Sequence, residues 1–279
     1  MPELPEVETI SRELGAKILH KKIRKVVIYQ SKLRWLIPEN LPGLVQGATF
    51  QKIERRGRYL LCRTETGTMI LHLGMSGHLC YSAERPHLPA KHEHLTIYFA
   101  DNTVLAFIDP RKFGACLWTE EDPLLHQLLN NLGPEPLTDN FNAAYLATKI
   151  KNRKVPIKQL IMDNKAVVGV GNIYANEALF QAKINPLTPA QQLTSFEVKT
   201  LVAAIKQVLE TAIKTGGSSI RDYKKSDGST GSFQKHFAVY RQENQPCKVC
   251  GTLIKKIRQA GRSTFYCANC QPMLAKKLV

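Results

Sequence analysis

Residues 247–270, CKVCGTLIKKIRQAGRSTFYCANC, contain two Cys-x₂-Cys pairs separated by 16 residues. This is the spacing of a structural zinc site, in which each pair supplies two thiolates to one tetrahedral ion. All four positions are cysteine, so no coordination position is left open for a substrate. The sequence between the pairs predicts a β-hairpin with Arg262 at its tip, after Gly261. We therefore predict one structural zinc ion held by Cys247, Cys250, Cys267 and Cys270. Disulfide pairing is the alternative, and it requires an oxidising compartment.

The composition of the whole chain favours a cytoplasmic protein with a polyanionic partner. The 279 residues include 39 Lys+Arg against 23 Asp+Glu, a formal net charge of +16. Such an excess of positive charge favours binding to a polyanion, because Lys and Arg side chains release counterions from its phosphates. A basic surface that serves only to keep the protein soluble is the alternative. No apolar run approaches the about 20 residues that a membrane helix needs, and the N-terminus has no apolar signal-peptide core. We therefore expect a nucleic-acid partner and no membrane partner.

The first 130 residues predict one helix followed by short strands. Residues 5–19 place Val7, Ile10, Leu14 and Ile18 on one helical stripe, and Pro5 suits the first turn of a helix. Runs with alternating apolar residues follow, and turn signals such as ETGT and ADNT separate several of them. They are KIRKVVIYQ, ATFQKIERR, RYLLCRT, TMILHL, HLTIYFA and TVLAFID. This pattern predicts an antiparallel β-rich domain capped by an N-terminal helix.

Helical patterns replace the strands beyond the Pro/Gly-rich boundary at 131–141. They are NAAYLATKIKN, PIKQLIMDN, NIYANEALFQA and an amphipathic stretch at 194–214. The Gly/Ser/Lys-rich residues 215–233 are consistent with a flexible linker or with a loop that covers a ligand. We predict an α+β protein with three domains, at 1–132, 133–240 and 241–279.

The N-terminal residues MPELPE suggest nucleophilic catalysis as well as a helix start. A small residue after Met1 permits removal of the initiator methionine, which would expose the secondary amine of Pro2. A terminal amine titrates near pH ~8, roughly two units below lysine, so more of it is neutral and able to attack a sugar carbon. Glu3, and Glu6 one turn later, would supply carboxylates for proton transfer. Simple helix capping by these residues is the alternative.

Six motifs occur together and in order along the chain. They are MPELPEVET at the start, HLGMSG at 72–77, KHEH at 91–94, DPRKFG at 109–114, MDNKAVVGVGNIYANEALF at 162–180 and the Cys₄ finger. This set resembles the bacterial formamidopyrimidine-DNA glycosylase family over essentially the whole chain. The resemblance implies a β-sandwich, a helix–two-turn–helix domain and a zinc finger. It also implies excision of oxidised purines (8-oxoguanine and formamidopyrimidines) from duplex DNA, followed by strand nicking through β,δ-elimination.

The resemblance also assigns roles to single residues at the catalytic site. Pro2 matches the nucleophile that forms a Schiff base with C1′. Glu3 matches the general acid/base at the deoxyribose, and Glu6 matches the helix carboxylate that orders this site. Arg262 matches the residue assigned to δ-elimination. Arg58, in RRGRYLL, stands where the family has a lysine, and an arginine is a poor proton shuttle because its guanidinium stays protonated.

The resemblance also assigns residues that contact DNA. Three side chains match those inserted into the gap that an extruded nucleotide leaves, and four match phosphate-contacting or lesion-proximal positions. The first set is Met75, Arg111 and Phe113; the second is His72, His92, Lys154 and Asn172. Residues 215–233 match the loop that closes over the everted base. We expect a monomer that binds damaged double-stranded DNA, associates with the nucleoid and needs no obligate protein partner.

Two alternatives to this function remain open on the sequence. The first is the sister glycosylase for oxidised pyrimidines, endonuclease VIII, which shares the architecture. PELPE and the Met75, Arg111 and Phe113 set favour the purine-specific branch. The second is a zinc-containing DNA-binding protein without catalysis, and the retained Pro2–Glu3 pair argues against it because binding alone needs neither residue.

Overall fold

The computed structural model describes residues 2–83, 88–218 and 231–273. The chain divides into two compact units, which are Met1–Asn131 with Thr215–Ser232, and Leu132–Lys214 with Phe233–Val279. Each unit is described by itself below. Within the described residues, no helix is both long enough and apolar enough to span a membrane.

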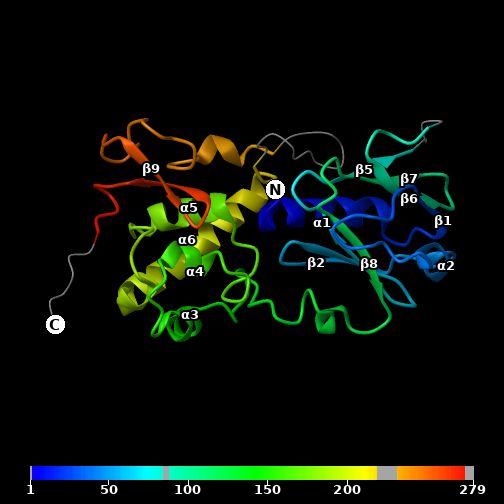
Figure 1. Cartoon of the computed structure of the whole chain (residues 1–279), viewed down its shortest axis with the longest axis horizontal. Coiled ribbons are helices and arrows are strands. Elements are labelled where there is room, and N and C mark those ends of the chain that lie inside the picture. Colours follow the sequence, from blue (N-terminus) through cyan, green and yellow to red (C-terminus); the bar gives the residue numbers. More distant parts are fainter. Residues whose placement is uncertain (1, 84–87, 219–230, 274–279) are drawn as a thin grey trace. The chain divides into compact units, whose positions relative to one another are not determined.

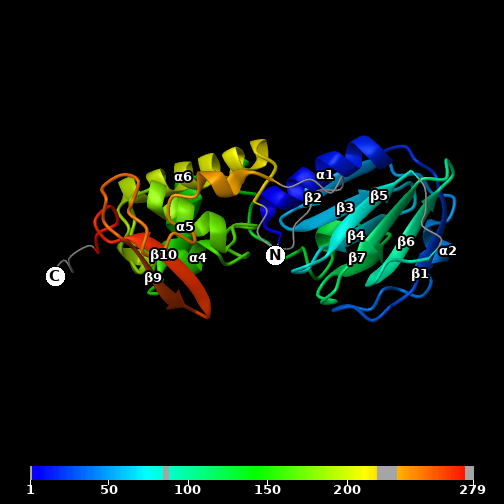
Figure 2. The ribbon, with the colours of Figure 1, turned by 90° about the horizontal axis from the view of Figure 1, so that it is seen from above.

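The first unit is an antiparallel β-sandwich with one long helix. Two four-stranded sheets have the strand orders β1-β6-β7-β5 and β2-β3-β4-β8. Helix α1 (Leu4–Ile18) lies beside β2 and β3 (Figure 2). The strands are β1 (Ile23–Ile28), β2 (Lys52–Arg56), β3 (Tyr59–Arg63), β4 (Thr68–His72), β5 (His78–Ser82), β6 (Glu93–Phe99), β7 (Val104–Ile108) and β8 (Ala115–Thr119). A short helix, α2 (Leu41–Val45), follows β1.

The core of this unit lies between the helix stripe and the two sheets. Val7, Ile10, Leu14 and Ile18 are buried in one apolar cluster with side chains from both sheets. The predicted helix and the six predicted strands are therefore confirmed. Strands β5 and β8 lie outside the predicted runs, and they pair with β7 and β4 respectively.

The second unit combines helices with a two-stranded hairpin (Figure 1). Its helices are α3 (Ala143–Ile150), α4 (Ile157–Ile161), α5 (Asn172–Gln181) and α6 (Ser195–Lys214), and its strands are β9 (Ile254–Gln259) and β10 (Arg262–Cys267). Three-residue or four-residue 3₁₀ turns lie at Pro123–Leu125 in the first unit and at Ala190–Gln192 and Phe233–His236 in the second. All four predicted helical segments and the predicted hairpin are confirmed, and together they place the fold in the α+β class.

Candidate functional site

The N-terminal tip is held by a pair of buried carboxylates. Glu3 is the N-cap of α1, and its backbone N–H donates to Glu6 Oε2 at 2.8 Å in a capping-box arrangement. Glu3 and Glu6 are only 5% and 2% exposed, and Pro2 is buried beside them. The capping interpretation of the sequence is therefore correct locally, and the same contact fixes the position of Glu3. Met1, whose removal the sequence predicts, lies outside the described residues.

Glu6 also binds a segment that is more than 200 residues away in the chain. Its Oε1 accepts hydrogen bonds from Ser218 N at 2.7 Å and from Ser218 Oγ at 3.0 Å. Gly217 has a φ of +77°, and a Cβ there would lie 3.0 Å from the Glu6 side chain. One carboxylate thus joins the N-terminal tip to the start of the predicted lesion-covering segment, 215–233. Residues 219–230 of that segment lie outside the described residues.

Met75 and Phe113 project from two turns of the sandwich. Met75 lies between β4 and β5 and is 36% exposed, while Phe113 lies between β7 and β8 and is 41% exposed. The guanidinium carbon of Arg111 lies 4.8 Å from the centroid of the Phe113 ring, within cation–π range. Neither apolar side chain belongs to the buried core.

Asp109 holds these two turns together. Its side chain is fully buried and accepts hydrogen bonds from Ser76 Oγ at 2.8 Å, Gly114 N at 2.8 Å and Arg111 N at 3.2 Å. Glycine is required where the turns meet, because a Cβ on Gly74 would lie 2.5 Å from the Phe113 backbone. We call the assembly of residues 73–77 and 109–114 the wedge.

His72, at the end of β4, lies beside a cluster of cations. Burial first, and then the positive charges of Arg58 and Arg34, lower the pKa of His72 to about 4. Its ring is 4.8 Å from that of Tyr59, centroid to centroid. His72 is therefore neutral at physiological pH and sits with two arginines next to the wedge. Arg34 carries no motif signal, and only the fold brings it here.

His92 lies in the turn before β6 and adopts a positive φ of 66°. Its ring is exposed, and its carbonyl oxygen accepts a hydrogen bond from Asp109 N at 3.0 Å. The basic KHEH turn is thereby fastened to the wedge. The second histidine of this motif, His94, is buried and contacts the Asp109 carbonyl at 2.7 Å, which is a structural role.

In the second unit, Asn172 is joined to the hairpin by a buried lysine. Asn172 begins α5, where the free backbone amides of a helix N-terminus suit an anion. Its Oδ1 accepts from Lys158 Nζ at 2.7 Å, and Lys158 also donates to Thr264 Oγ1 at 2.6 Å and to Ser263 O at 3.1 Å. Lys158 is 1% exposed. Sequence reasoning missed it because nothing in PIKQLI distinguishes a buried lysine from a solvated one.

Arg262 and Lys154 occupy exposed positions in the same unit. Arg262 begins β10 directly after a tight turn in which Ala260 and Gly261 have positive φ. Ser263 and Thr264, the next two residues, are the ones that bind Lys158. Lys154 lies in the loop before α4, exposed and three residues from that helix. The structure thus brings Asn172 and the Arg262 strand together and leaves Lys154 on the neighbouring loop.

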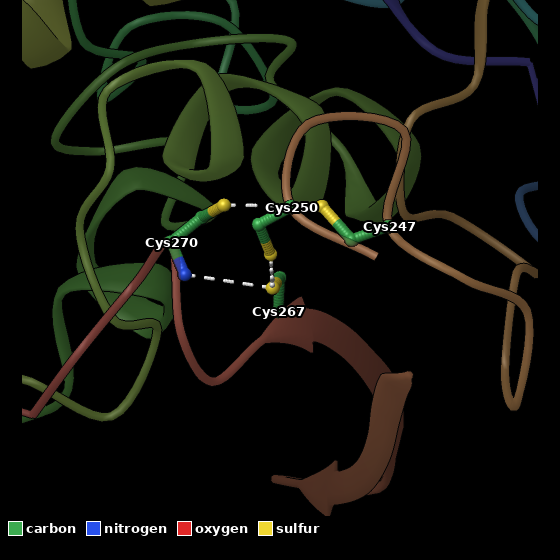
Figure 3. A group of neighbouring side chains, drawn as sticks. All are labelled: Cys247, Cys250, Cys267 and Cys270. Atoms are coloured by element: carbon green, nitrogen blue, oxygen red, sulfur yellow. Dashed lines mark hydrogen bonds between the residues drawn. The ribbon is translucent and has the colours of Figure 1, made fainter. Parts of the chain in front are cut away.

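The four cysteines of the two Cys-x₂-Cys pairs converge on one point (Figure 3). Their sulfur atoms all lie within 4.8 Å of one another, with 3.4 Å between Cys250 and Cys267 and 3.8 Å between Cys247 and Cys270. Four thiolates around a tetrahedral zinc ion with Zn–S bonds of about 2.3 Å lie about 3.8 Å apart. The cysteines are free rather than bonded in disulfides. The site therefore fits one structural zinc ion.

Buried polar side chains tie the zinc module to α5. Asn176 Oδ1 accepts from Phe265 N at 2.8 Å, and Gln271 Nε2 donates to Ile184 O at 2.8 Å. Glu177 accepts three backbone N–H bonds, from Ala238, Val239 and Tyr240, at 2.7–3.1 Å. Burial raises the pKa of Glu177, whereas these amides oppose the rise. Metal binding, helix position and the placement of Arg262 are thus coupled.

Three family models match the chain. They are the formamidopyrimidine-DNA glycosylase N-terminal domain at residues 1–116, the H2TH domain of the same family at 132–224, and a zinc finger found in FPG and IleRS at 244–272. Two curated relatives carry the name formamidopyrimidine-DNA glycosylase. The protein from Methylobacillus flagellatus is 48% identical over 97% of this chain and 96% of its own. The protein from a Marinomonas species is 50% identical over 97% and 100%.

Solved structures with this fold include complexes with DNA. A mutant of Lactococcus lactis FPG bound to DNA that contains Fapy-dG has a TM-score of 0.90 and 37% identity, covering 98% of this chain and 100% of that chain. The same protein bound to abasic-site DNA has a TM-score of 0.90 and 36% identity, with the same coverage. The MutM (FPG) protein from Thermus thermophilus has a TM-score of 0.86 and 36% identity, covering 97% and 98%.

Proposed function

The chain belongs to the formamidopyrimidine-DNA glycosylase family, and from this premise we propose how its own residues carry out the reaction. As a member of the family it is a base-excision repair enzyme, a DNA glycosylase and AP lyase that acts on oxidised purine lesions. The observation that carries the residue assignment is the Glu6 carboxylate, which binds both the Glu3 backbone and Ser218. It supports a proposal in which Glu3 is the general acid/base and Pro2 the nucleophile at a fixed N-terminal tip.

Pro2 is the nucleophile of this proposal. Removal of Met1 leaves a secondary amine whose pKa lies near ~8, so a useful fraction is neutral at physiological pH. The nitrogen lone pair attacks C1′ of the damaged nucleotide, the N-glycosidic bond breaks, and its electron pair leaves with the base, which takes up a proton. Glu3 supplies and removes protons at the deoxyribose, where ring opening gives a covalent iminium. Loss of a proton from C2′ then expels the 3′ phosphate.

Glu6 is a positioning residue in this scheme. Both its oxygens are occupied by fixed donors, so it holds Glu3 without itself reaching the substrate. The same carboxylate binds Ser218, so it also holds the residues at the start of the 215–233 segment. Arg262, exposed on the hairpin, supports the second elimination at the 5′ phosphate.

Met75, Arg111 and Phe113 fill the gap in the duplex. An enzyme of this class extrudes its target nucleotide and must compensate for lost stacking, for which a thioether, a guanidinium and an aromatic ring are suited. Their exposure on two turns that share Asp109 supports this assignment. His72, His92, Lys154 and Asn172 contact the DNA backbone in this proposal, and Lys158 orients Asn172.

Arg58 is proposed to bind DNA rather than to shuttle protons. Its charge lowers the pKa of His72, so its guanidinium lies near the wedge, and a guanidinium holds a phosphate well. An Arg58→Lys variant tests this assignment. Faster strand nicking with unchanged base excision would show that the arginine limits elimination. Unchanged rates of both steps would show that the substitution is inconsequential.

The working form of the enzyme is proposed to be a monomer on damaged duplex DNA. Residues 1–132 carry the chemistry, 133–240 and the 241–279 module grip the backbone, and no obligate protein partner is needed. The DNA complexes of the Lactococcus relative support the choice of duplex DNA as partner.

Borohydride trapping on a duplex with 8-oxoguanine opposite cytosine tests the mechanism. The mature protein should form a covalent adduct, and Pro2→Gly should lose it while it still binds the duplex. A chain with residues added before Pro2 is the matched control, since it folds alike but has no terminal proline amine. Failure of the mature wild type to trap, with tight binding retained, would overturn the enzyme mechanism and favour a non-catalytic binder. Faster trapping on an oxidised pyrimidine would instead favour the endonuclease VIII alternative.

A further inference from the structure

Residues Ser31–Ile37, between β1 and α2, form an anchored loop with an outward-facing polar and aromatic edge. Ile37 N donates to Ser31 O at 3.0 Å, which closes the loop. Leu33 and Ile37 are buried in the core cluster of the sandwich. The other side chains point outward, and Trp35 and Leu36 are 38% and 68% exposed. Burial of Leu33 and Ile37 leaves Lys32, Arg34 and Trp35 exposed.

This loop forms one wall of a cavity that the wedge completes. This cavity, which we call the wedge cavity, has a volume of about 760 Å³ and lies entirely within the first unit. Its lining comes from three segments, which are Lys32–Arg34, His72–Met75 and Arg111–Phe113. The residues proposed to enter the DNA gap thus share a surface with a loop that has no assigned part in the reaction.

The lining of the wedge cavity is strongly basic. Lys32, Arg34, Arg111 and Lys112 contribute to it, and no carboxylate lines it among the residues that the structure describes. Arg34 is also close enough to His72 and to Tyr59 for its charge to act on the pKa of both side chains. Cations gathered around exposed apolar side chains suit a phosphate backbone with bases beside it.

The hydrogen bonding of His72 makes it a donor toward an anion. Gly74 N donates to His72 Nδ1 at 3.1 Å, so in the neutral ring the proton is assigned to Nε2. A neutral N–H donor next to a guanidinium is a ligand set for one phosphate, since the guanidinium supplies the charge and both groups donate hydrogen bonds.

We propose that Arg34 and His72 together bind one phosphate of the damaged duplex, and that the loop Ser31–Ile37 is a DNA-contacting element beside the wedge. Lys32 adds charge to the same contact, and Trp35 lies at its edge. This inference rests on the proposed function, because it takes the wedge to be the part that enters DNA. It deepens that function by adding a loop that carries none of the six sequence motifs.

Equilibrium binding to a lesion duplex tests the role of Arg34. Arg34→Ala should weaken binding about tenfold and reduce the slope of log K against log salt by about 0.9, the value for one phosphate contact. Arg34→Lys should restore most of the slope. Arg24→Ala is the matched control, because Arg24 is an exposed arginine of the same unit that bonds Asn102 and does not line the cavity. An unchanged affinity and slope in Arg34→Ala would overturn the proposal.

A double-mutant cycle tests whether the two side chains share one phosphate. Arg34→Ala and His72→Gln should together weaken binding by clearly less than the product of their separate effects. Fully independent effects would overturn the shared phosphate. Borohydride trapping by the wild type separates this outcome from failure of the proposed function, since trapping does not depend on which residues hold that phosphate.

Tryptophan fluorescence reports on the loop directly. The chain has two tryptophans, and Trp118→Phe leaves Trp35 as the only one. Saturation with lesion duplex should shift or quench Trp35 emission in this background. Emission that is the same with and without saturating duplex would place the loop away from the DNA and overturn the proposal.

Discussion

The wedge and the zinc hairpin each present an exposed arginine, but they are held in place by different means. Arg111 sits on a turn organised by one buried carboxylate, Asp109, within a continuous β-sandwich. Arg262 sits at the tip of a two-stranded hairpin whose base is a four-cysteine site. The first arrangement is complete once the sandwich has folded. The second requires a metal ion and a set of buried amide contacts to α5.

This difference predicts how each part of the protein responds to the loss of the contacts that hold it. Loss of a contact in the wedge leaves a mispositioned turn on an intact core. Loss of the metal removes the constraint on a module with a very small apolar core of its own, which includes Val239, Ile254 and Phe265. The four predictions below test this contrast, beginning with the largest expected effect.

Removal of zinc should abolish DNA binding. Cys250→Ser deprives the site of one thiolate, and because metal binding supplies folding free energy to such modules, the hairpin should unfold. Zinc content, measured by atomic absorption, and duplex affinity should be lost together, while the sandwich keeps its own folding transition. Cys80→Ser, in β5, is the control and should retain both. Normal affinity in a zinc-free Cys250→Ser protein would contradict the coupling.

Asp109→Ala should loosen the wedge without unfolding the sandwich. The change leaves Ser76 Oγ and Gly114 N without their acceptor in a buried place, which costs about 2–4 kcal/mol of the free energy of unfolding. Urea denaturation measures this loss, and 2-aminopurine fluorescence in the duplex measures base extrusion. Both should fall. A variant with full stability and normal extrusion would show that Asp109 does not organise the turns.

Lys158→Met should weaken the contact between Asn172 and the hairpin, leaving the direct hydrogen bond from Asn172 Nδ2 to Ser263 O, while zinc remains bound. Three hydrogen bonds from one ammonium are lost, and we expect about 2 kcal/mol of destabilisation and about tenfold weaker duplex binding. Lys199→Met, at an exposed position of α6, is the matched control. Zinc content should be normal in both proteins. Equal duplex affinity of the two variants would show that the lysine network has no part in the DNA grip.

His72 should make stability fall at mildly acidic pH. Burial and two arginines lower its pKa to about 4 in the folded state, against about 6.5 in the unfolded chain. Between pH 4 and 6.5 the unfolded state binds more protons than the folded state at this residue. The contribution of His72 to the free energy of unfolding is therefore complete above pH ~6.5 and is lost as the pH falls toward 4. We expect about 2 kcal/mol less stability at pH 5 than at pH 7 from this group. His72→Gln should remove that part of the pH dependence, and an unchanged pH profile would contradict the assignment.

Local patterns predicted much of the fold. The Val7, Ile10, Leu14 and Ile18 stripe predicted α1, and alternating runs predicted six of the eight strands of the sandwich. Strands β5 and β8 were not among those runs, and only the structure shows that they pair with β7 and β4. Lys158 and Arg34 were missed for a related reason. A lysine and an arginine carry the same local signal whether they are buried, paired or solvated.

The sequence by itself determined the zinc ligands, the family motifs and the helix that begins at Leu4, because each depends on spacing over a few residues. Tertiary structure alone decided that Glu6 would bind Ser218, that Asp109 would join two turns, and that Arg34 would lie beside His72. The hydrogen bond between Glu6 and Ser218 joins residues 212 positions apart, and the one between Ser76 and Asp109 joins residues 33 positions apart. Periodicity reports which face of an element is buried. It carries no information about which distant group will meet that face.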